Sequence, residues 1–138
     1  MNSNSHIVNK YLRKTQKSAH LFAKAKCVFP SAITHDSRHI TPYGIYVNKA
    51  DGSKKWDVDG NVYVDYFGGH GALLLGHANK AVEAAVSQTL GLGTHFGANH
   101  PLELKWADAV IQLLPSAQRV RFTSSGTEAT LMALRLAR

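Results

Sequence analysis

The end of the sequence places the strongest restriction on the fold, because a helix that is apolar nearly all round follows a short predicted strand. The apolar positions of residues 127–138 are Ala129, Leu131, Met132, Ala133, Leu134, Leu136 and Ala137. A helix of this kind belongs inside a layered α/β body that covers several of its faces. We therefore predict the α/β class, with a strand at Arg119–Thr123, and we expect the 138 residues to be a fragment of a larger domain.

The turn between that strand and that helix has the clearest chemistry in the sequence. Ser124-Ser125-Gly126-Thr127 combines hydroxyls with free backbone N–H groups at the positive end of a helix dipole. This combination favours a phosphate or another dianion, and Gly126 permits close approach to the backbone. The same residues, with Glu128 near the cap, also fit an ordinary helix N-terminus. Residue chemistry alone leaves both interpretations open.

Two other phosphate-binding motifs are absent from the sequence. No G-x-x-x-x-G-K-[ST] run occurs, which excludes a P-loop. Gly69-His70-Gly71 is followed by Leu74 where a dinucleotide-binding turn requires glycine. These absences argue against a nucleotide-dependent enzyme.

The middle of the chain predicts a small antiparallel sheet. Three β-type runs, Ile45–Asn48, Lys54–Val58 and Val62–Phe67, are separated by Asp-Gly turns that favour positive φ. The stretch from Phe29 to Tyr43 before them is bounded by prolines and reads as a loop. We therefore predict a three-stranded meander within residues 27–77.

Two further helices are predicted after a glycine-rich segment at residues 68–77. Asn79 is a suitable N-cap for the first helix, which Gly91 ends. Pro101 occupies a favoured first position of the second helix, which stops before Pro115. With the final strand and helix, these elements assign residues 78–138 to the truncated start of a large domain.

Basic residues are concentrated at the start of the chain. Residues 1–26 contain six Lys and Arg and no acidic residue, whereas the remaining 112 residues contain ten basic and nine acidic residues. We predict one amphipathic docking helix over residues 1–26, with a targeting or nucleic-acid role as alternatives. Because the rest of the chain is nearly neutral and no apolar stretch is long enough for a membrane span, we predict a cytoplasmic protein without nucleic-acid or membrane partners.

Three motifs in order and spacing carry a resemblance to a known family. They are Asp57-Val58-Asp59-Gly60-Asn61-Val62-Tyr63-Val64-Asp65-Tyr66, Leu75-Gly76-His77, and Arg121-Phe122-Thr123-Ser124-Ser125-Gly126-Thr127-Glu128-Ala129. Residues 28–138 resemble the class III aminotransferases, particularly the glutamate-1-semialdehyde aminomutase and D-phenylglycine aminotransferase types. The resemblance implies an incomplete fold type I transferase that depends on pyridoxal 5'-phosphate. It would contain the N-terminal helix and meander of the small domain and the start of the three-layer α/β large domain.

The resemblance also assigns roles to individual residues. Ser125, Gly126 and Thr127 would hold the cofactor phosphate, with Glu128 behind them. Arg38 matches a loop residue that reaches the substrate carboxylate, and the nearby serine of aminomutases falls at His35. His70 stands where aminomutases carry an aromatic residue. This departure favours an aminotransferase acting on an amino acid and an oxo acid over the aminomutase, which remains an alternative.

The resemblance places the catalytic lysine, which forms a Schiff base with the cofactor, after the phosphate turn. The ten lysines of this chain end at Lys105, so we expect the chain to be inactive by itself. The family also implies a homodimer. Residue chemistry alone allows another interpretation of each residue: Arg38 would be a solvated charge, and His70 would be a polar residue lining a turn. It also allows a non-enzymatic small binding module.

The remaining histidines and the single cysteine do not predict a metal site. The pairs His70/His77 and His95/His100 are too loosely spaced for one, and one cysteine cannot form a thiolate zinc site. We expect His77 to make a structural hydrogen bond instead.

Overall fold

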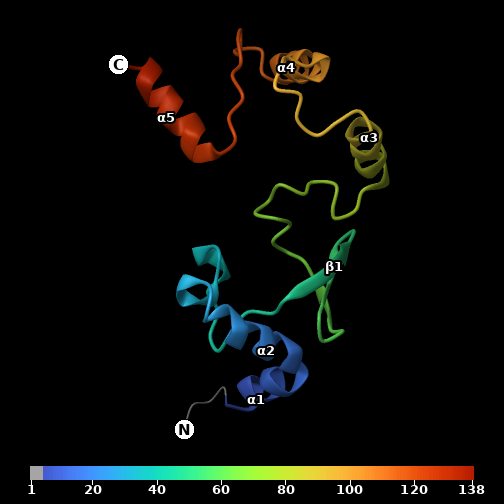
Figure 1. Cartoon of the computed structure of the whole chain (residues 1–138), viewed down its shortest axis with the longest axis vertical. Helices are drawn as coiled ribbons and strands as arrows, with labels where there is room; N and C mark the ends of the chain where they lie inside the picture. Colours follow the sequence, from blue (N-terminus) through green and yellow to red (C-terminus); the bar gives the residue numbers. More distant parts are fainter. Residues whose placement is uncertain (1–4) are drawn as a thin grey trace. The chain divides into compact units, whose positions relative to one another are not determined.

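A computed structural model describes residues 5–138, which form two compact units. The first unit ends at Gly91 and the second covers Leu92–Arg138. Figure 1 shows the helices and strands along the chain.

The first unit begins with two helices, α1 (Ser5–Lys14) and α2 (Gln16–Ala25), where one helix was predicted over residues 1–26. The prediction of a continuous helix is wrong, and residues 1–4 lie outside the described residues. The break falls at Thr15, which is buried and has non-helical φ and ψ of −127° and 41°. Its hydroxyl bonds to the Tyr11 carbonyl at 2.7 Å and lies 3.0 Å from the Tyr43 hydroxyl. Side-chain bonds of this kind compete with regular helix geometry.

The loop after α2 contains two short 3-10 helices, η1 (Pro30–Ala32) and η2 (Asp36–Arg38). The predicted meander follows and is confirmed, with β1 (Val47–Asp51), β2 (Lys54–Asp57) and β3 (Val62–Val64) antiparallel in the order β1-β2-β3. Strand β1 starts two residues later than predicted, and its register shifts between Val47 and Lys49. Strand β3 is shorter than the predicted Val62–Phe67, because the chain bends at Tyr66 and Phe67.

Helix α2 is attached to the meander through one carboxylate in the β2–β3 turn. Asp59 accepts hydrogen bonds from the backbone N–H groups of Lys17 and Ser18 at 2.6 and 3.0 Å, and from the Ser18 hydroxyl at 2.7 Å. Thr15, the N-cap residue, makes no side-chain capping bond. A distant turn therefore supplies the acceptor that the start of α2 needs.

Three helices occupy the rest of the chain: α3 (Lys80–Leu90), α4 (Pro101–Leu113) and α5 (Gly126–Leu136). The predicted helix starts are confirmed, because the Asn79 side chain caps α3 and Pro101 is the first residue of α4. No residue of these three helices is buried. Their apolar faces are thus covered only in part within the portion of the chain that the structure describes.

The predicted strand at Arg119–Thr123 does not form, so that prediction is wrong. These residues lie outside the three-stranded sheet, which is the only sheet among residues 5–138. A strand needs a hydrogen-bonded neighbour, and residue pattern alone cannot supply one. Phe122 instead stacks on Trp106 of α4, with ring centroids 3.5 Å apart.

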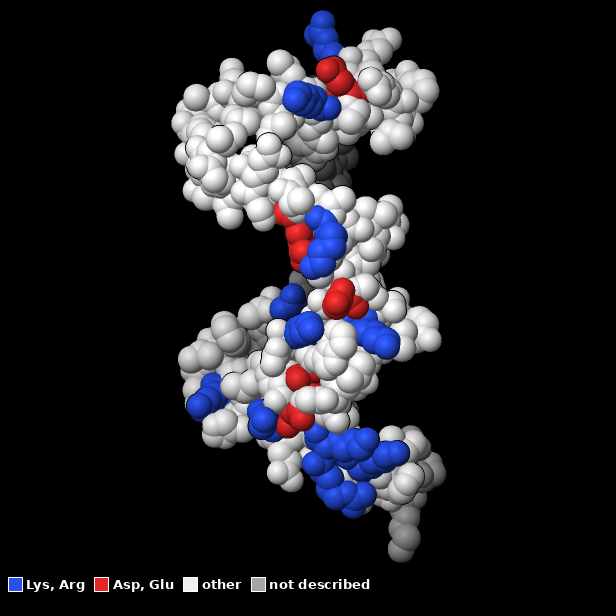
Figure 2. All heavy atoms as spheres, turned by 90° about the vertical axis from the view of Figure 1, so that its right-hand side faces the viewer, with Lys and Arg blue, Asp and Glu red and all other residues white. Residues whose placement is uncertain are grey.

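The positive charge is distributed as the sequence predicts. Figure 2 shows Lys and Arg side chains gathered at the end of the chain that contains α1 and α2. Within residues 5–138, no helix has the length and apolar character needed to cross a membrane. The role of the basic helices stays a prediction.

Candidate functional site

The predicted phosphate site lies at the start of α5, in the second unit. Ser125 is the N-cap, and its hydroxyl accepts the Glu128 N–H at 3.2 Å. The Glu128 carboxylate accepts the Ser124 N–H at 2.8 Å. These two bonds fix the turn, which we call the phosphate corner (residues 124–128), and they leave its other donors able to face a ligand.

The donors of the phosphate corner suit an anion. Gly126 and Thr127 occupy the first helical turn, where backbone N–H groups have no partner within the helix. The Ser125 hydroxyl accepts one bond through its oxygen and can still donate its own proton, as can that of Thr127. The positive end of the α5 dipole adds to the attraction for negative charge.

Space is available at the phosphate corner within the described residues. A Cβ added to Gly126 would meet no atom within 4 Å. Gly126 and Thr127 line an open hollow of about 520 Å³ together with Thr130, Leu131 and Leu134. The residues present therefore fit a phosphate group.

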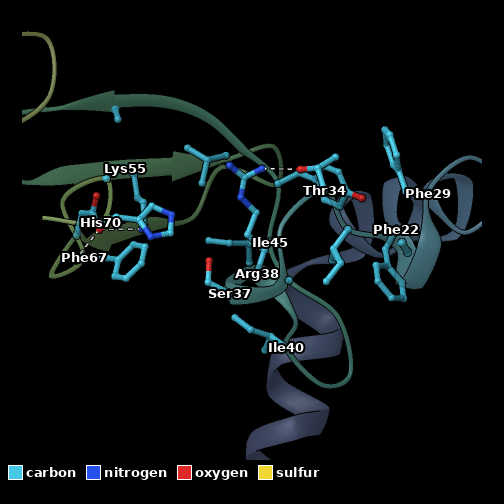
Figure 3. Close-up of a pocket in the computed structure, with 18 of the residues that line it drawn as sticks. Phe22, Phe29, Thr34, Ser37, Arg38, Ile40, Ile45, Lys55, Phe67 and His70 are labelled. Atoms are coloured by element: carbon cyan, nitrogen blue, oxygen red, sulfur yellow. Dashed lines mark hydrogen bonds and ion pairs between the residues drawn. The ribbon is translucent and has the colours of Figure 1, made fainter. Parts of the chain in front are cut away.

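A cavity of about 590 Å³ lies in the first unit, and Arg38 is on its wall. We call it the Arg38 cavity (Figure 3). Arg38 ends η2, and its Nη1 donates to the Thr34 hydroxyl at 2.9 Å. A guanidinium carries five N–H donors in a planar fork, so this single bond leaves it able to hold a carboxylate.

His70 also lines the Arg38 cavity, so two predicted site residues that lie far apart in the sequence come together there. Its ring lies 4.5 Å from that of Phe67 and 5.2 Å from that of His35, measured between centroids. His35 caps η2, with its Nδ1 2.8 Å from the Ser37 hydroxyl. His35 is therefore a neighbour of the cavity wall that contacts His70.

Three charged or titratable residues near His70 were not predicted as one group. The carboxylate of Asp65 lies 2.9 Å from Lys55 Nζ and 2.7 Å from His77 Nε2, and it accepts the Phe67 N–H at 3.0 Å. Bonds from His77, then Lys55, then the Phe67 N–H hold the pKa of Asp65 well below its ordinary value. The expected structural hydrogen bond of His77 is confirmed.

The sequence contained a weak signal for this group. Asp65 and His77 both belong to the motifs quoted above, but their spacing of 12 residues matches no local structure. Within residues 5–138, no group of three or more His, Cys, Asp or Glu is arranged to hold a metal ion.

Known proteins resemble this chain throughout most of its length. The family model for class III aminotransferases matches residues 34–138. Glutamate-1-semialdehyde 2,1-aminomutase of Methanosphaera stadtmanae is 46% identical over 125 residues, which are 91% of this chain and 30% of that protein. The chain thus spans about 30% of the length of this curated relative.

Solved structures agree with the family model. A transaminase with PLP bound is 38% identical to this chain, with a TM-score of 0.87, and the match covers 90% of this chain and 29% of the transaminase chain. A β-phenylalanine aminotransferase from Variovorax paradoxus is 27% identical, with a TM-score of 0.90, and the match covers 94% of this chain and 30% of the aminotransferase chain.

These likenesses confirm the predicted fold class, an incomplete α/β fold of the type I PLP-dependent transferases. The family match includes the phosphate corner, the Arg38 cavity residues from Thr34 onward and the whole meander. It extends over more than half of the chain. The chain belongs to the class III aminotransferases, whose cofactor is pyridoxal 5'-phosphate.

Proposed function

We propose that this chain provides the cofactor-phosphate site and part of the substrate wall of an aminotransferase. The complete enzyme would transfer an amino group between an amino acid and an oxo acid. Pyridoxal 5'-phosphate supplies the electron-accepting ring for such chemistry when it is bound. The residues of this chain bind and orient, and they do not carry out the proton transfers.

The observation that carries the proposal is the open phosphate corner. A phosphate dianion there would receive the N–H groups of Gly126 and Thr127 and the hydroxyl protons of Ser125 and Thr127. Glu128 would not touch it, because its carboxylate already accepts the Ser124 N–H. Its role would be to hold the turn in the shape that directs the other donors outward.

The Arg38 cavity is the proposed substrate wall. The Arg38 guanidinium would bind the substrate carboxylate through its remaining donors. His70 and His35 form one ring pair beside it, and His70 replaces the aromatic residue of aminomutases. This replacement favours an aminotransferase.

The aminomutase is a second candidate, and a specific finding supports it. Curated relatives with 44% and 46% identity are named glutamate-1-semialdehyde aminomutase. The two candidates differ in whether a separate oxo acid is consumed. From the family resemblance we also infer a homodimer and a cytoplasmic location for the complete enzyme.

The phosphate corner is tested by comparing two ligands that differ only in the phosphate ester. We expect the chain to bind pyridoxal phosphate more tightly than pyridoxal. The double substitution Ser125→Ala with Thr127→Val should weaken pyridoxal phosphate binding at least about tenfold, since hydrogen bonds to charged groups contribute about 1.5–3 kcal/mol each. Ser124→Ala is the matched control and should change little.

The same titration shows how the proposal fails. Equal affinity for pyridoxal and pyridoxal phosphate would mean that the corner is only a helix cap. We also expect no turnover from the 138 residues with cofactor, amino donor and oxo acid, because the last lysine, Lys105, precedes the corner. Measurable turnover would contradict this assignment of roles.

A further inference from the structure

The glycine-rich segment at residues 68–77 is held in a defined shape without a hydrophobic core. Gly68, Gly69, Gly71 and Gly76 all have positive φ, and so does His70 at 62°. The leucines at positions 73, 74 and 75 are exposed by 40%, 93% and 68%. Glycines lose much conformational freedom on ordering, and a positive φ is unfavourable for histidine. Burial does not offset these costs. Four backbone hydrogen bonds within residues 67–76 form the turns of the segment, and contacts with the rest of the unit add to them.

One carboxylate bonds to both ends of the segment. Asp65 accepts the backbone N–H of Phe67, immediately before the segment, at 3.0 Å. Its second oxygen lies 2.7 Å from Nε2 of His77, the last residue of the segment. Asp65 thereby closes the segment into a loop from its own position just after β3.

The far end of the segment is also fixed to the β1–β2 hairpin. His77 and Gly52 exchange two backbone hydrogen bonds, both of 2.9 Å. Gly76 approaches Gly52 so closely that an added Cβ would lie 2.8 Å from the Gly52 carbonyl oxygen. The end of the segment therefore has one backbone anchor and one side-chain anchor.

The middle of this closed loop is part of the wall of the Arg38 cavity. His70 contacts Phe67 and His35 through its ring and lines the cavity with Arg38. In Figure 3 the rings of Phe67 and His70 lie next to each other on the cavity wall. The turn that contains His70 is held by backbone hydrogen bonds from Gly71 to Phe67 and from Leu73 to Gly68, of 2.9 and 3.0 Å, and Asp65 joins the two ends of the loop around it.

We propose that Asp65 and His77 act as positioning residues: their side-chain bond closes residues 68–77 and places His70 against the Arg38 cavity. We call this bond the Asp65–His77 clasp. Lys55, which bonds to the other oxygen of Asp65 from β2, belongs to the sheet and does not close the loop. The Asp65–His77 clasp does not depend on the proposed function. The effect of the clasp on ligand binding does rest on the proposed function, because it assumes that the Arg38 cavity binds a carboxylate.

The clasp is tested by NMR relaxation and ring contacts in the full chain. His77→Leu and Asp65→Asn should lower the order parameters of the amides at 68–72 from about 0.85 to below about 0.6. Both should also abolish the contact between the His35 and His70 rings. Lys55→Met is the matched control, because it removes a bond to the same carboxylate and should leave the loop ordered. Cross-strand contacts between Trp56 and Val62, which pair between β2 and β3, report whether the sheet remains folded in each variant.

Three results overturn the clasp. The first is that the amide order parameters at 68–72 stay unchanged in both His77→Leu and Asp65→Asn. The second is that Lys55→Met lowers them as much as those two substitutions do. The third is that the contact between the His35 and His70 rings persists although the order parameters have fallen. His77 lies outside the three strands, so His77→Leu decides the matter if Asp65→Asn disturbs the sheet.

A ligand titration separates this inference from the proposed function. Benzoate serves as the carboxylate probe, followed through the signals of Arg38 and His70. We expect binding about tenfold weaker in His77→Leu, because the loop must then be ordered on binding. No shift of Arg38 in the unmodified chain would contradict the substrate role of the cavity and leave the clasp intact. Equal binding in both chains would show that the clasp does not serve the cavity.

Discussion

Asp57 is the residue whose environment is most completely determined by hydrogen bonds. Asp57 is only 1% exposed. Its carboxylate accepts four hydrogen bonds, from the backbone N–H groups of Asp59 and Asn61, from the side-chain amide of Asn61 and from the Tyr63 hydroxyl. Burial raises the pKa of Asp57, but the bonds from Asn61, Tyr63 and the two N–H groups outweigh it, so the pKa lies below its ordinary value. The ionised form is therefore built into the β2–β3 turn.

We expect Asp57→Asn to lower the free energy of unfolding by about 2 kcal/mol at pH 7, because an amide turns one acceptor into a donor that faces other donors. Because the pKa of Asp57 is lower in the folded state than its unfolded-state value of about 3.9, ionised Asp57 stabilises the fold at pH values above that unfolded-state value. This stabilisation is lost as the pH falls through the folded-state pKa. The difference between the two chains should therefore shrink below about pH 4.

Urea unfolding followed by Trp56 fluorescence measures this difference, in a Trp106→Phe background that leaves one tryptophan. Asp51→Asn, at an exposed position of β1, is the control. A gap that stays constant down to about pH 3 would exclude ionised Asp57 as its source.

Single-residue roles were predictable only where their partners are close in sequence. Asn79 and Pro101 act within one helical turn, and both were identified. Asp59 and Asp65 read as turn or motif residues, because Lys17 and His77, which bond to them, lie 42 and 12 positions away. The partners of Asp57 lie within six positions, but a turn pattern does not show that they converge on its carboxylate. The Arg38 cavity residues came from family resemblance rather than from residue chemistry.

At the scale of elements, the start of α2 depends on the β2–β3 turn. Asp59 bonds to the second and third N–H groups of α2, where an N-cap side chain normally bonds. Burial raises the pKa of Asp59, but the bonds from Ser18 and Lys17 lower it further than burial raises it. The helix and the meander are thus joined by a cap that comes from another element.

Asp59→Ala should release this cap and speed amide hydrogen exchange at Lys17 and Ser18 by roughly fivefold to thirtyfold, the factor that corresponds to a lost cap of about 1–2 kcal/mol. Exchange at β2 amides should change less. Asp51→Ala is the control here, since it removes an exposed carboxylate from the same unit. Unchanged exchange at Lys17 and Ser18 would show that α2 needs no cap from the turn.

Elements differ in how far the local sequence determines them. The caps of α3, α4 and α5 are side chains next to the helix, so their starts follow from pattern. The break at Thr15 depends on Tyr43, 28 residues away, and a helical pattern cannot reveal it. The predicted strand at Arg119–Thr123 fails for a related reason, because a strand needs a hydrogen-bonded neighbour and no described residue pairs with it in a sheet.

At the scale of the whole molecule, the buried residues are confined to the first unit. Among residues 5–138 they are Thr15, Ser18, Ala25, Ala32, Tyr43 and Asp57. Tyr43 packs against the rings of Tyr11 and Phe22, with centroids 5.3 and 5.9 Å away. In the second unit, Leu113 and Leu136 are exposed by 80% and 89%. Stability that comes from burial therefore resides in the first unit.

We accordingly expect a chain that ends at Gly91 to keep the stability of the first unit. Its free energy of unfolding, measured in urea through Trp56 fluorescence, should agree with that of the 138-residue chain in the Trp106→Phe background to within about 0.5 kcal/mol, the usual range for changes away from buried contacts. Tyr43→Ala should lower both values by about 3 kcal/mol, since it removes a buried aromatic side chain. A loss of more than about 1 kcal/mol on truncation would show that Leu92–Arg138 contributes to the stability of the first unit, and would contradict this prediction.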